Sequence, residues 1–383
     1  MATESFLPRS NGVVNSVIQC SKELLELGHQ VEIICPGEGP NLVNGVKVHR
    51  VSSFAVDPVA QVDFATVTVG RIRTLVERFQ PDVVHCASPV LLGEKVAKIS
   101  RALGIPTVAI FQTDLSGFAL HYGMNAWLAK KLIDKRVKKV HEGMDLTLAP
   151  SIHSRDYLEN LGVSAVKIWR RGVDLAAFTP KLRSEAIRAS WNREPNTVFV
   201  GYVGRLAPEK KIMNMGAISR FESGSRRNVQ LVFIGDGPSK IALQEQFPDG
   251  VFTGKLSGVD LYSSLASLDV VVTTGENETF CQVIQEGFAS ALPVVAPAIG
   301  GPLDLVEHDE TGFLYHPGDR RELAEYVSLL VNDESKRIRM GLAAQAKVQN
   351  RSWRALTVEL LAHYQSVITP EFHREKFHRE KVA

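Results

Sequence analysis

The chain has 383 residues, 44% of them hydrophobic, and its 44 basic and 42 acidic side chains give a formal net charge of +2. This length favours two domains of about 180 residues, each with a core of its own. A protein that binds nucleic acid by bulk electrostatics carries a strong basic excess, so the balanced charge argues against a nucleic-acid partner.

The four cysteines indicate a reducing compartment. Cys20, Cys35, Cys86 and Cys281 lie far apart, and none of them forms a C-x-x-C pair. The spacing of metal ligands is absent, so we expect no metal site. The sequence also contains no run of eighteen apolar residues and no signal peptide, which predicts a cytoplasmic protein.

Helices and strands alternate through the first half of the chain. Helical periodicity runs over residues 13–27 and ends at Gly28, and a strand follows at 30–35. The pattern continues with strands at 46–51, 82–86, 106–111 and 145–150 and helices at 67–79, 91–103, 127–141 and 151–161. This alternation predicts a parallel doubly wound sheet. A first strand is missing from the pattern before residue 13, so we expect that strand to be truncated.

Ligands of such a sheet bind beyond the carboxyl ends of its strands. Gly12, His85 and the segment from Gln112 to Asp114 fall at such ends. Gly12 either lets backbone approach a ligand at the start of a helix or serves a simple turn. We expect His85 to be structural.

The predicted helix at 127–141 is strongly basic. It carries Lys130, Lys131, Lys135, Arg136, Lys138 and Lys139. A solvated face is the ordinary interpretation of such a run. The interleaved Trp127, Leu128, Leu132 and Ile133 also suit peripheral contact with an anionic membrane, such as the inner face of the plasma membrane.

The polar stretch 181–196 predicts a linker between two domains. We assign residues 1–182 to an N-terminal domain and 183–367 to a C-terminal domain, with the last helix a candidate for crossing back. Residues 368–383 form a charged tail with a duplicated pentapeptide, to which we assign no function.

Cations follow the first strand of the second domain. After the strand at 197–204 come Gly204-Arg205, Lys210 and Lys211, and cations at the carboxyl end of a strand suit a diphosphate, with about 1.5–3 kcal/mol per charge-assisted contact. A plain surface loop is the alternative. A later strand ends in Lys255-Leu256, where main-chain groups can hold a flat base. No P-loop or full G-x-G-x-x-G motif occurs, which disfavours an ATPase or a dehydrogenase.

The stretch 275–296 predicts a loop, a helix and a return strand. Glu278 lies at the predicted mouth of the helix, and Glu286 lies about two turns inside it. Backbone N–H groups of Thr279, Phe280, Cys281 and Gln282 would bind phosphate oxygens, while the carboxylates would accept hydrogen bonds from sugar hydroxyls. This division of labour suits a nucleotide-sugar. The alternative is an acidic first turn that merely complements the helix dipole.

Together these motifs resemble those of a known family. They are Pro8-Arg9-Ser10-Asn11-Gly12-Val13, Gln112-Thr113-Asp114, Arg171-Gly172-Val173-Asp174, Gly204-Arg205 with Lys210, and Glu278-Thr279-Phe280 with Glu286. Up to about residue 367 the chain resembles the retaining GT-B glycosyltransferases of family four, and it looks closest to the actinobacterial GDP-mannose-dependent α-mannosyltransferases that build membrane glycolipids.

The resemblance implies two Rossmann-like domains facing a cleft, with the nucleotide-sugar held mainly by the C-terminal domain and the lipid or glycolipid acceptor by the N-terminal domain. In such enzymes the equivalents of Arg205 and Lys210 bind the diphosphate, that of Glu278 holds sugar hydroxyls and that of Glu286 holds the ribose. Fixed cations and helix-mouth amides then replace a metal. The donor contacts so implied are completed by Gly12, Gln112, Asp114, Gly204, Lys255 and Leu256.

Some positions depart from the family pattern. Gln112 stands where many relatives carry a histidine, so we expect it to contact the donor sugar without acid–base work. Cys281 replaces a common glycine, and Ala291 replaces the glycine usual before Pro293. No well-placed protein nucleophile is visible, and the resemblance suggests a same-face mechanism in which the leaving phosphate takes the acceptor proton.

The sequence leaves other functions open. A UDP-sugar-dependent glucosyl or N-acetylglucosaminyl transferase would share these motifs, because main-chain recognition hides the identity of the base. A non-catalytic nucleotide-sugar-binding protein is the alternative from a different class. A phosphorylase would additionally require a lysine that binds pyridoxal phosphate.

Overall fold

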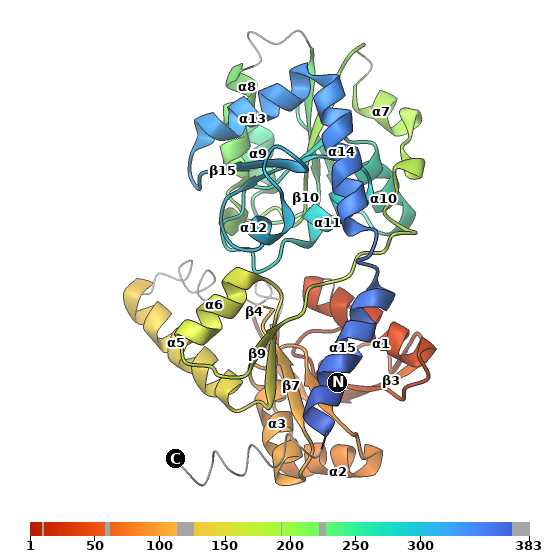
Figure 1. Cartoon of the computed structure of the whole chain (residues 1–383), viewed down its shortest axis with the longest axis vertical. Coiled ribbons are helices and arrows are strands. Elements are labelled where there is room, and N and C mark those ends of the chain that lie inside the picture. Colours follow the sequence, from red (N-terminus) through yellow and green to blue (C-terminus); the bar gives the residue numbers. More distant parts are fainter. Residues whose placement is uncertain (10, 58–61, 113–125, 193, 222–226, 370–383) are drawn as a thin grey trace. The chain divides into compact units, whose positions relative to one another are not determined.

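The structure is a computed structural model, and it describes the chain except for residues 10, 58–61, 113–125, 193, 222–226 and 370–383. Contacts within the chain divide it into two compact units (Figure 1). Unit 1 contains Met1–Arg171 and Trp353–Ala383, and unit 2 contains Gly172–Ser352. The chain therefore passes between units after Arg171 and again after Ser352, whereas the sequence suggested a division at 182/183.

The sheet of unit 1 consists of two groups of strands, ordered β2-β3-β1 and β6-β7-β8-β9. The strands are β1 (Glu32–Pro36), β2 (Leu42–Val43), β3 (Val46–Val51), β6 (Val84–Cys86), β7 (Thr107–Ile110), β8 (Leu146–Ala149) and β9 (Val166–Ile168). Ala2 joins the groups through parallel bridges to Ile34 of β1 and Cys86 of β6. Its N–H donates to the His85 carbonyl at 2.8 Å. The place of the first strand, which we expected to be truncated, is taken by Ala2 alone, through these two isolated bridges.

The helices of unit 1 are α1 (Gly12–Glu26), α2 (Val69–Phe79), α3 (Leu92–Ala102), α5 (Ala126–Glu142), α6 (Ile152–Asn160) and α15 (Trp353–Ile368). Helices α1, α2 and α6 of unit 1 begin at residues whose side chains cap them. The Asn11 side chain accepts hydrogen bonds from the backbone N–H groups that start α1, and the Ser151 side chain caps α6. A hairpin of β4 (Ser53–Asp57) and β5 (Val62–Ala65) was not predicted.

The C-terminal helix α15 packs in unit 1. Its buried Leu360 and Tyr364 belong to the same core cluster as Leu148 of β8 and Trp169. The Trp169 indole donates a hydrogen bond to the Leu356 carbonyl at 2.8 Å, and His85 Nδ1 lies 2.5 Å from Tyr364 Oη. His85 is therefore buried in the contact that holds α15, which is a structural environment.

Unit 2 contains a parallel sheet of order β12-β11-β10-β13-β14-β15. Its strands are β10 (Val198–Val203), β11 (Val229–Ile234), β12 (Val251–Gly254), β13 (Val270–Val272), β14 (Val294–Pro297) and β15 (Gly312–Tyr315). Numbered from β10, this order is 3-2-1-4-5-6, the Rossmann arrangement. The strand order reverses between β10 and β13, and a ligand crevice is expected at their carboxyl ends.

Both faces of this sheet are covered, because successive side chains of a strand point to opposite faces. In β10, Val200 joins one core cluster and Phe199 the other. The first cluster includes residues of α8 (Gly216–Phe221) and α13 (Arg320–Asn332), and the second includes residues of α11 (Gln282–Ala289) and α14 (Glu334–Val348). The remaining helices are α9 (Lys240–Gln246), α10 (Gly258–Ala266) and α12 (Gly301–Leu305).

Two local predictions were wrong. The stretch 181–196, predicted as a linker, contains the end of a 3-10 turn and helix α7 (Glu185–Trp191), which begins at the Ser184 cap. Helix α11 begins at Gln282, not at Thr279, so Glu286 lies about one turn inside it rather than two. Among the described residues, no helix is long and apolar enough to cross a membrane.

Candidate functional site

The candidate site of unit 2 lies where its strand order reverses. Gly204 and Arg205 follow β10, and the loop from Thr273 to Glu278 follows β13. Because β10 and β13 are parallel neighbours, their carboxyl ends lie at the same edge of the sheet. This topology brings the predicted cationic loop beside the predicted sugar-binding carboxylate.

Each of the cations Arg205, Lys210 and Lys211 contacts a carboxylate. Lys210 Nζ lies 2.6 Å from Glu278 Oε1. Arg205 pairs with Glu209, and Lys211 pairs with Glu276. The Thr274 hydroxyl also donates to the Lys210 carbonyl at 2.6 Å, which ties the loop after β10 to the one after β13. A diphosphate bound here would compete with carboxylates for these cations.

The electrostatics of the cluster keep Lys210 charged. Burial alone would lower the pKa of Lys210, but the ion pair with Glu278 outweighs it and the pKa is raised. Tyr202, on β10, is buried, and burial raises its pKa well above the usual value, with further contributions from Glu278 and Glu209. Its neutral hydroxyl donates to the Arg205 carbonyl at 3.1 Å and so links β10 to the cationic loop that follows it.

The backbone of Glu278 also contacts the start of α12, where Gly300 is the N-cap and Gly301 the first residue. The Gly301 N–H donates to the Glu278 carbonyl at 2.8 Å. A Cβ atom at Gly301 would lie 2.4 Å from the Cα atom of Phe280, so no other residue fits at this contact without backbone movement. This role of Gly301 was not predicted from the sequence, although Gly-Gly-Pro is a common signal for the start of a helix.

The two positions that depart from the family glycines carry backbone strain. Cys281, the N-cap of α11, has φ of 70°, and Ala291 has φ of 57°. Both values lie in the left-handed region that favours glycine. Cys281 is nevertheless buried, and its Sγ atom lies 3.7 Å from the Thr273 hydroxyl. Helix α11 therefore begins at a residue with a strained backbone conformation, three residues after Glu278.

The other predicted donor contacts of unit 2 are more dispersed. Phe280 is fully buried and packs in the core, so only its backbone can face a ligand. Gln282 donates to the Gly172 carbonyl at 2.9 Å, while its buried Oε1 has no hydrogen-bond partner among the residues that the structure describes. The side chain of Thr279 is half-buried. The pKa of Tyr262 is raised mainly by burial, and Glu286 contributes to the shift.

The other predicted contacts lie further from the helix along the chain. Lys255 is exposed after the end of β12, and the neighbouring Leu256 packs against the core.

A second cluster forms in unit 1. Gln112 follows β7, is 9% exposed and donates to the Ala87 carbonyl at 3.0 Å. Arg171 donates to Gln112 Oε1 at 2.6 Å, and a Cβ atom at Gly12 would lie 2.7 Å from Arg171 Nη1. Gly12 therefore leaves room for an arginine guanidinium, a role that the sequence did not suggest. Asp114 lies outside the described residues.

Glu4 has a role in unit 1 that was not predicted from the sequence. Its Oε1 atom accepts hydrogen bonds from the backbone N–H groups of Leu91 and Gly93, at 2.6 and 3.1 Å, at the start of α3. Burial raises the pKa of Glu4, although these N–H groups oppose the shift. A single glutamate in an irregular segment carries no periodicity, so the sequence offered no clear signal for this role.

Comparisons with known proteins identify the family. The model described as Glycosyltransferase Family 4 matches residues 10–177, and Glycosyl transferases group 1 matches residues 183–347. The chain is 41% identical over 374 residues to a GDP-mannose-dependent alpha-mannosyltransferase of Mycobacterium tuberculosis, covering 96% of each chain. A relative of the same name from Mycolicibacterium smegmatis is 40% identical, covering 96% of this chain and 97% of the relative. The chain belongs to glycosyltransferase family 4.

Solved structures confirm the fold class of this family 4 glycosyltransferase. A sucrose-phosphate synthase from Thermosynechococcus elongatus has a TM-score of 0.75 at 18% identity, covering 96% of this chain and 99% of that one. Anabaena HepE, solved with UDP-glucose, has a TM-score of 0.73 at 20% identity, covering 95% and 99%. The predicted α/β architecture of two Rossmann-like halves is confirmed, and the enzyme is a glycosyltransferase.

Proposed function

We propose that the enzyme transfers mannose from GDP-mannose to an amphiphilic lipid or glycolipid acceptor, with retention of the α-configuration. The observation that carries the proposal is the ion pair between Lys210 and Glu278 at the reversal point of the unit 2 sheet. The pair places a cation that suits a diphosphate directly beside a carboxylate that suits sugar hydroxyls. The names of the relatives from Mycobacterium tuberculosis and Mycolicibacterium smegmatis support GDP-mannose as the donor.

In this proposal Arg205 and Lys210 bind the diphosphate and take up charge as it leaves. Glu278 accepts hydrogen bonds from hydroxyls of the transferred sugar, and Glu286 from the ribose. Backbone N–H groups at the start of α11 supply further donors to the phosphate oxygens. The leaving phosphate takes the acceptor proton on the same face of the sugar. Donor contacts by Gly12, Gln112 and Asp114 remain predictions.

A donor panel tests the proposal. Purified enzyme is incubated with membrane lipid extract and GDP-mannose, UDP-glucose or UDP-N-acetylglucosamine, and the released nucleoside diphosphate is measured. We expect turnover with GDP-mannose that depends on the lipid. Turnover with UDP-glucose alone would contradict the mannose donor. Binding of GDP-mannose without release of GDP in any extract would favour the non-catalytic binding protein.

We also propose that helix α5 contacts anionic membrane surfaces at the cytoplasmic side. Trp127 is 70% exposed and Leu132 is 54% exposed, which is unusual for large apolar side chains. Lys131 lies over the Trp127 ring at 5.2 Å, and Lys135 is exposed one turn further on. Apolar side chains beside exposed lysines suit an interface with anionic lipid. A relative at 26% identity is named for phosphatidylinositol dimannoside, a lipid acceptor.

Vesicle flotation tests this contact. We expect the enzyme to float with vesicles that contain anionic lipid and to remain unbound with zwitterionic vesicles. The double variant Lys131→Glu and Lys135→Glu should lose flotation, whereas Lys22→Glu on α1, where Lys22 is also exposed, should retain it. Flotation that does not depend on anionic lipid, or on these lysines, would end the proposal.

A further inference from the structure

A cavity of about 670 Å³ opens at the edge of the unit 2 sheet opposite the donor site. Its walls include Thr197 and Phe199 at the start of β10, and Asp269 just before β13. The donor loops follow the other end of β10, a strand of six residues. At about 3.3 Å per residue, the two edges are about 20 Å apart. A ligand in this cavity is therefore separate from the nucleotide-sugar.

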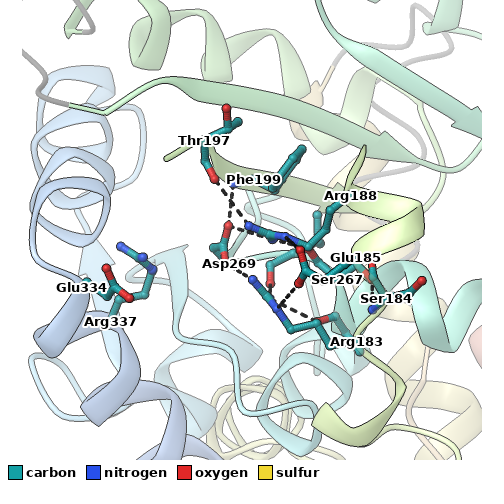
Figure 2. A network of polar contacts seen from close by, with 12 residues as sticks. Arg183, Ser184, Glu185, Arg188, Thr197, Phe199, Ser267, Asp269, Glu334 and Arg337 are labelled. Carbon is teal, nitrogen blue, oxygen red and sulfur yellow. Dashed lines mark hydrogen bonds and ion pairs between the residues drawn. The ribbon is translucent and has the colours of Figure 1, made fainter. Parts of the chain in front are cut away.

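One wall of the cavity is a network of polar contacts between two arginines and Asp269 (Figure 2). Arg183 Nη2 lies 2.7 Å from one Asp269 oxygen, and Arg188 Nη1 lies 3.0 Å from the other. Arg188 also lies over the Phe199 ring, with 4.3 Å between its Cζ atom and the ring centroid. The Phe199 N–H donates to Asp269 Oδ2 at 2.8 Å. These contacts fix both arginines and satisfy the Asp269 carboxylate.

The other wall is formed by the first turns of α14, where Arg337 and Glu334 lie together in Figure 2. Arg337 is 8% exposed, and its Nη1 donates to the carbonyls of Leu330 and Val331 at 2.6 and 3.3 Å. Glu334 pairs instead with Arg227, at 2.6 Å. Within the described part of the chain, Arg337 forms no ion pair with a carboxylate, unlike the other arginines of the cavity wall.

This arrangement leaves one buried positive charge without a direct ion pair among the described residues, although the nearby Asp269 and Glu334 partly offset its burial. Burial lowers the pKa of Arg337, but an arginine side chain stays protonated, so the unfavourable desolvation of its charge persists. The wall holds four arginines and four acidic side chains, and its other arginines pair with Asp269 or Glu334. Arg337 is therefore the wall arginine that is available to one anionic group. A guanidinium presents parallel N–H donors that match the oxygens of a phosphate.

We propose that this cavity is a second ligand site, which binds a small hydroxylated molecule that carries one phosphate group. The phosphate contacts Arg337, and the hydroxylated body lies along the polar rim formed by Asn192, Asn196 and Glu185. The volume falls in the range of about 300–1,000 Å³ that small-molecule sites occupy. The site is independent of the proposed mannosyl transfer, since it shares no residue with the donor site.

Calorimetric titration with glucose 6-phosphate tests the proposal on the full-length enzyme. Excess GDP and UDP are present throughout, so that the donor site is occupied. We expect saturable binding of one molecule per chain, and no binding of uncharged glucose under the same conditions. Arg337→Gln should weaken binding about tenfold or more, because a charge-assisted contact is lost. Arg339→Gln, an exposed residue of the same helix, should bind as wild type.

A second variant keeps the test decisive if Arg337→Gln fails to fold. Ala189 is exposed in the cavity wall, and Ala189→Glu adds a negative charge there without disturbing the core. It should also weaken binding about tenfold, whereas Ala186→Glu, on α7 outside the wall, should not. Absence of saturable binding, binding only when GDP and UDP are omitted, or wild-type affinity in Arg337→Gln or Ala189→Glu would overturn the proposal.

Discussion

Glu278→Gln is expected to change nucleotide binding and sugar transfer in opposite directions. Glu278 Oε1 lies 2.6 Å from Lys210 Nζ, with 20% and 26% of the two side chains exposed, so the carboxylate competes with a diphosphate for the lysine. Removing its charge while keeping its shape should tighten GDP binding by about 1 kcal/mol after solvent screening, or about fivefold. Losing a charged acceptor for sugar hydroxyls should cost about 1.5–3 kcal/mol in transfer, or about 10–100-fold in kcat/KM.

The assay pairs calorimetry of GDP binding with the rate of mannose transfer to lipid. Glu276→Gln is the matched control. Glu276 lies in the same loop as Glu278, pairs with Lys211 and has a similar exposed fraction of its side chain, 19%. It should tighten GDP binding as well, with transfer within about threefold of wild type, since no sugar contact is assigned to Glu276. Wild-type transfer by Glu278→Gln, or weaker GDP binding by it, would refute the reasoning.

Three further predictions follow from the strain, the buried histidines and the cationic loop. Ala291→Gly should raise the free energy of unfolding in urea by about 1 kcal/mol, because φ is positive there, whereas Ala289→Gly inside α11 should lower it. Burial lowers the pKa of His85 to about 3 and that of His141 to about 4, so between about pH 6.5 and 4 the unfolded chain binds protons that the folded chain does not. Stability should therefore fall on acidification by up to about 1.4 kcal/mol per pH unit for each histidine, and His85→Gln should reduce that slope. Lys210→Met should lower kcat about 10²–10³-fold, measured as GDP release, because charge develops on the diphosphate in the transition state; a change under threefold would exclude that role.

Much of the architecture could be predicted from periodicity. The alternation of strands and helices predicted the parallel sheets, and the predicted strand at 46–51 matches β3. Periodicity does not reveal which strands are neighbours. Nothing in the local sequence states that β13 lies beside β10, yet this pairing is what brings Glu278 to Lys210. The motif resemblance implied that both residues belong to one donor site, but it did not predict that they form an ion pair.

The errors have local physical causes. The segment 181–196 is polar, which suggested a linker, but Ser184 caps a short helix through a hydrogen bond from the Ile187 N–H. The predicted start of α11 was too early because Cys281 adopts a left-handed conformation, which residue type alone disfavours. The contact between Gly12 and Arg171 joins residues far apart in sequence, so only the folded unit could reveal it.

The same limit applies to the cavity that Arg337 lines. Its residues come from α7, the starts of β10 and β13, and α14, and no motif connects them. In the sequence, Arg337 is one of several basic residues on a helix, and such residues ordinarily face solvent. Only the packing of the helix shows that Arg337 is buried and forms no ion pair with a described carboxylate.

The anomeric configuration of the reaction product tests the central claim most directly. Purified enzyme is supplied with GDP-mannose labelled at the anomeric carbon and with membrane lipid extract, and the labelled lipid is isolated and examined by NMR. The account predicts a lipid-linked mannose in the α-configuration from wild type, and little product from Glu278→Gln. A β-linked mannose, or a product formed only from a UDP-sugar, would contradict it.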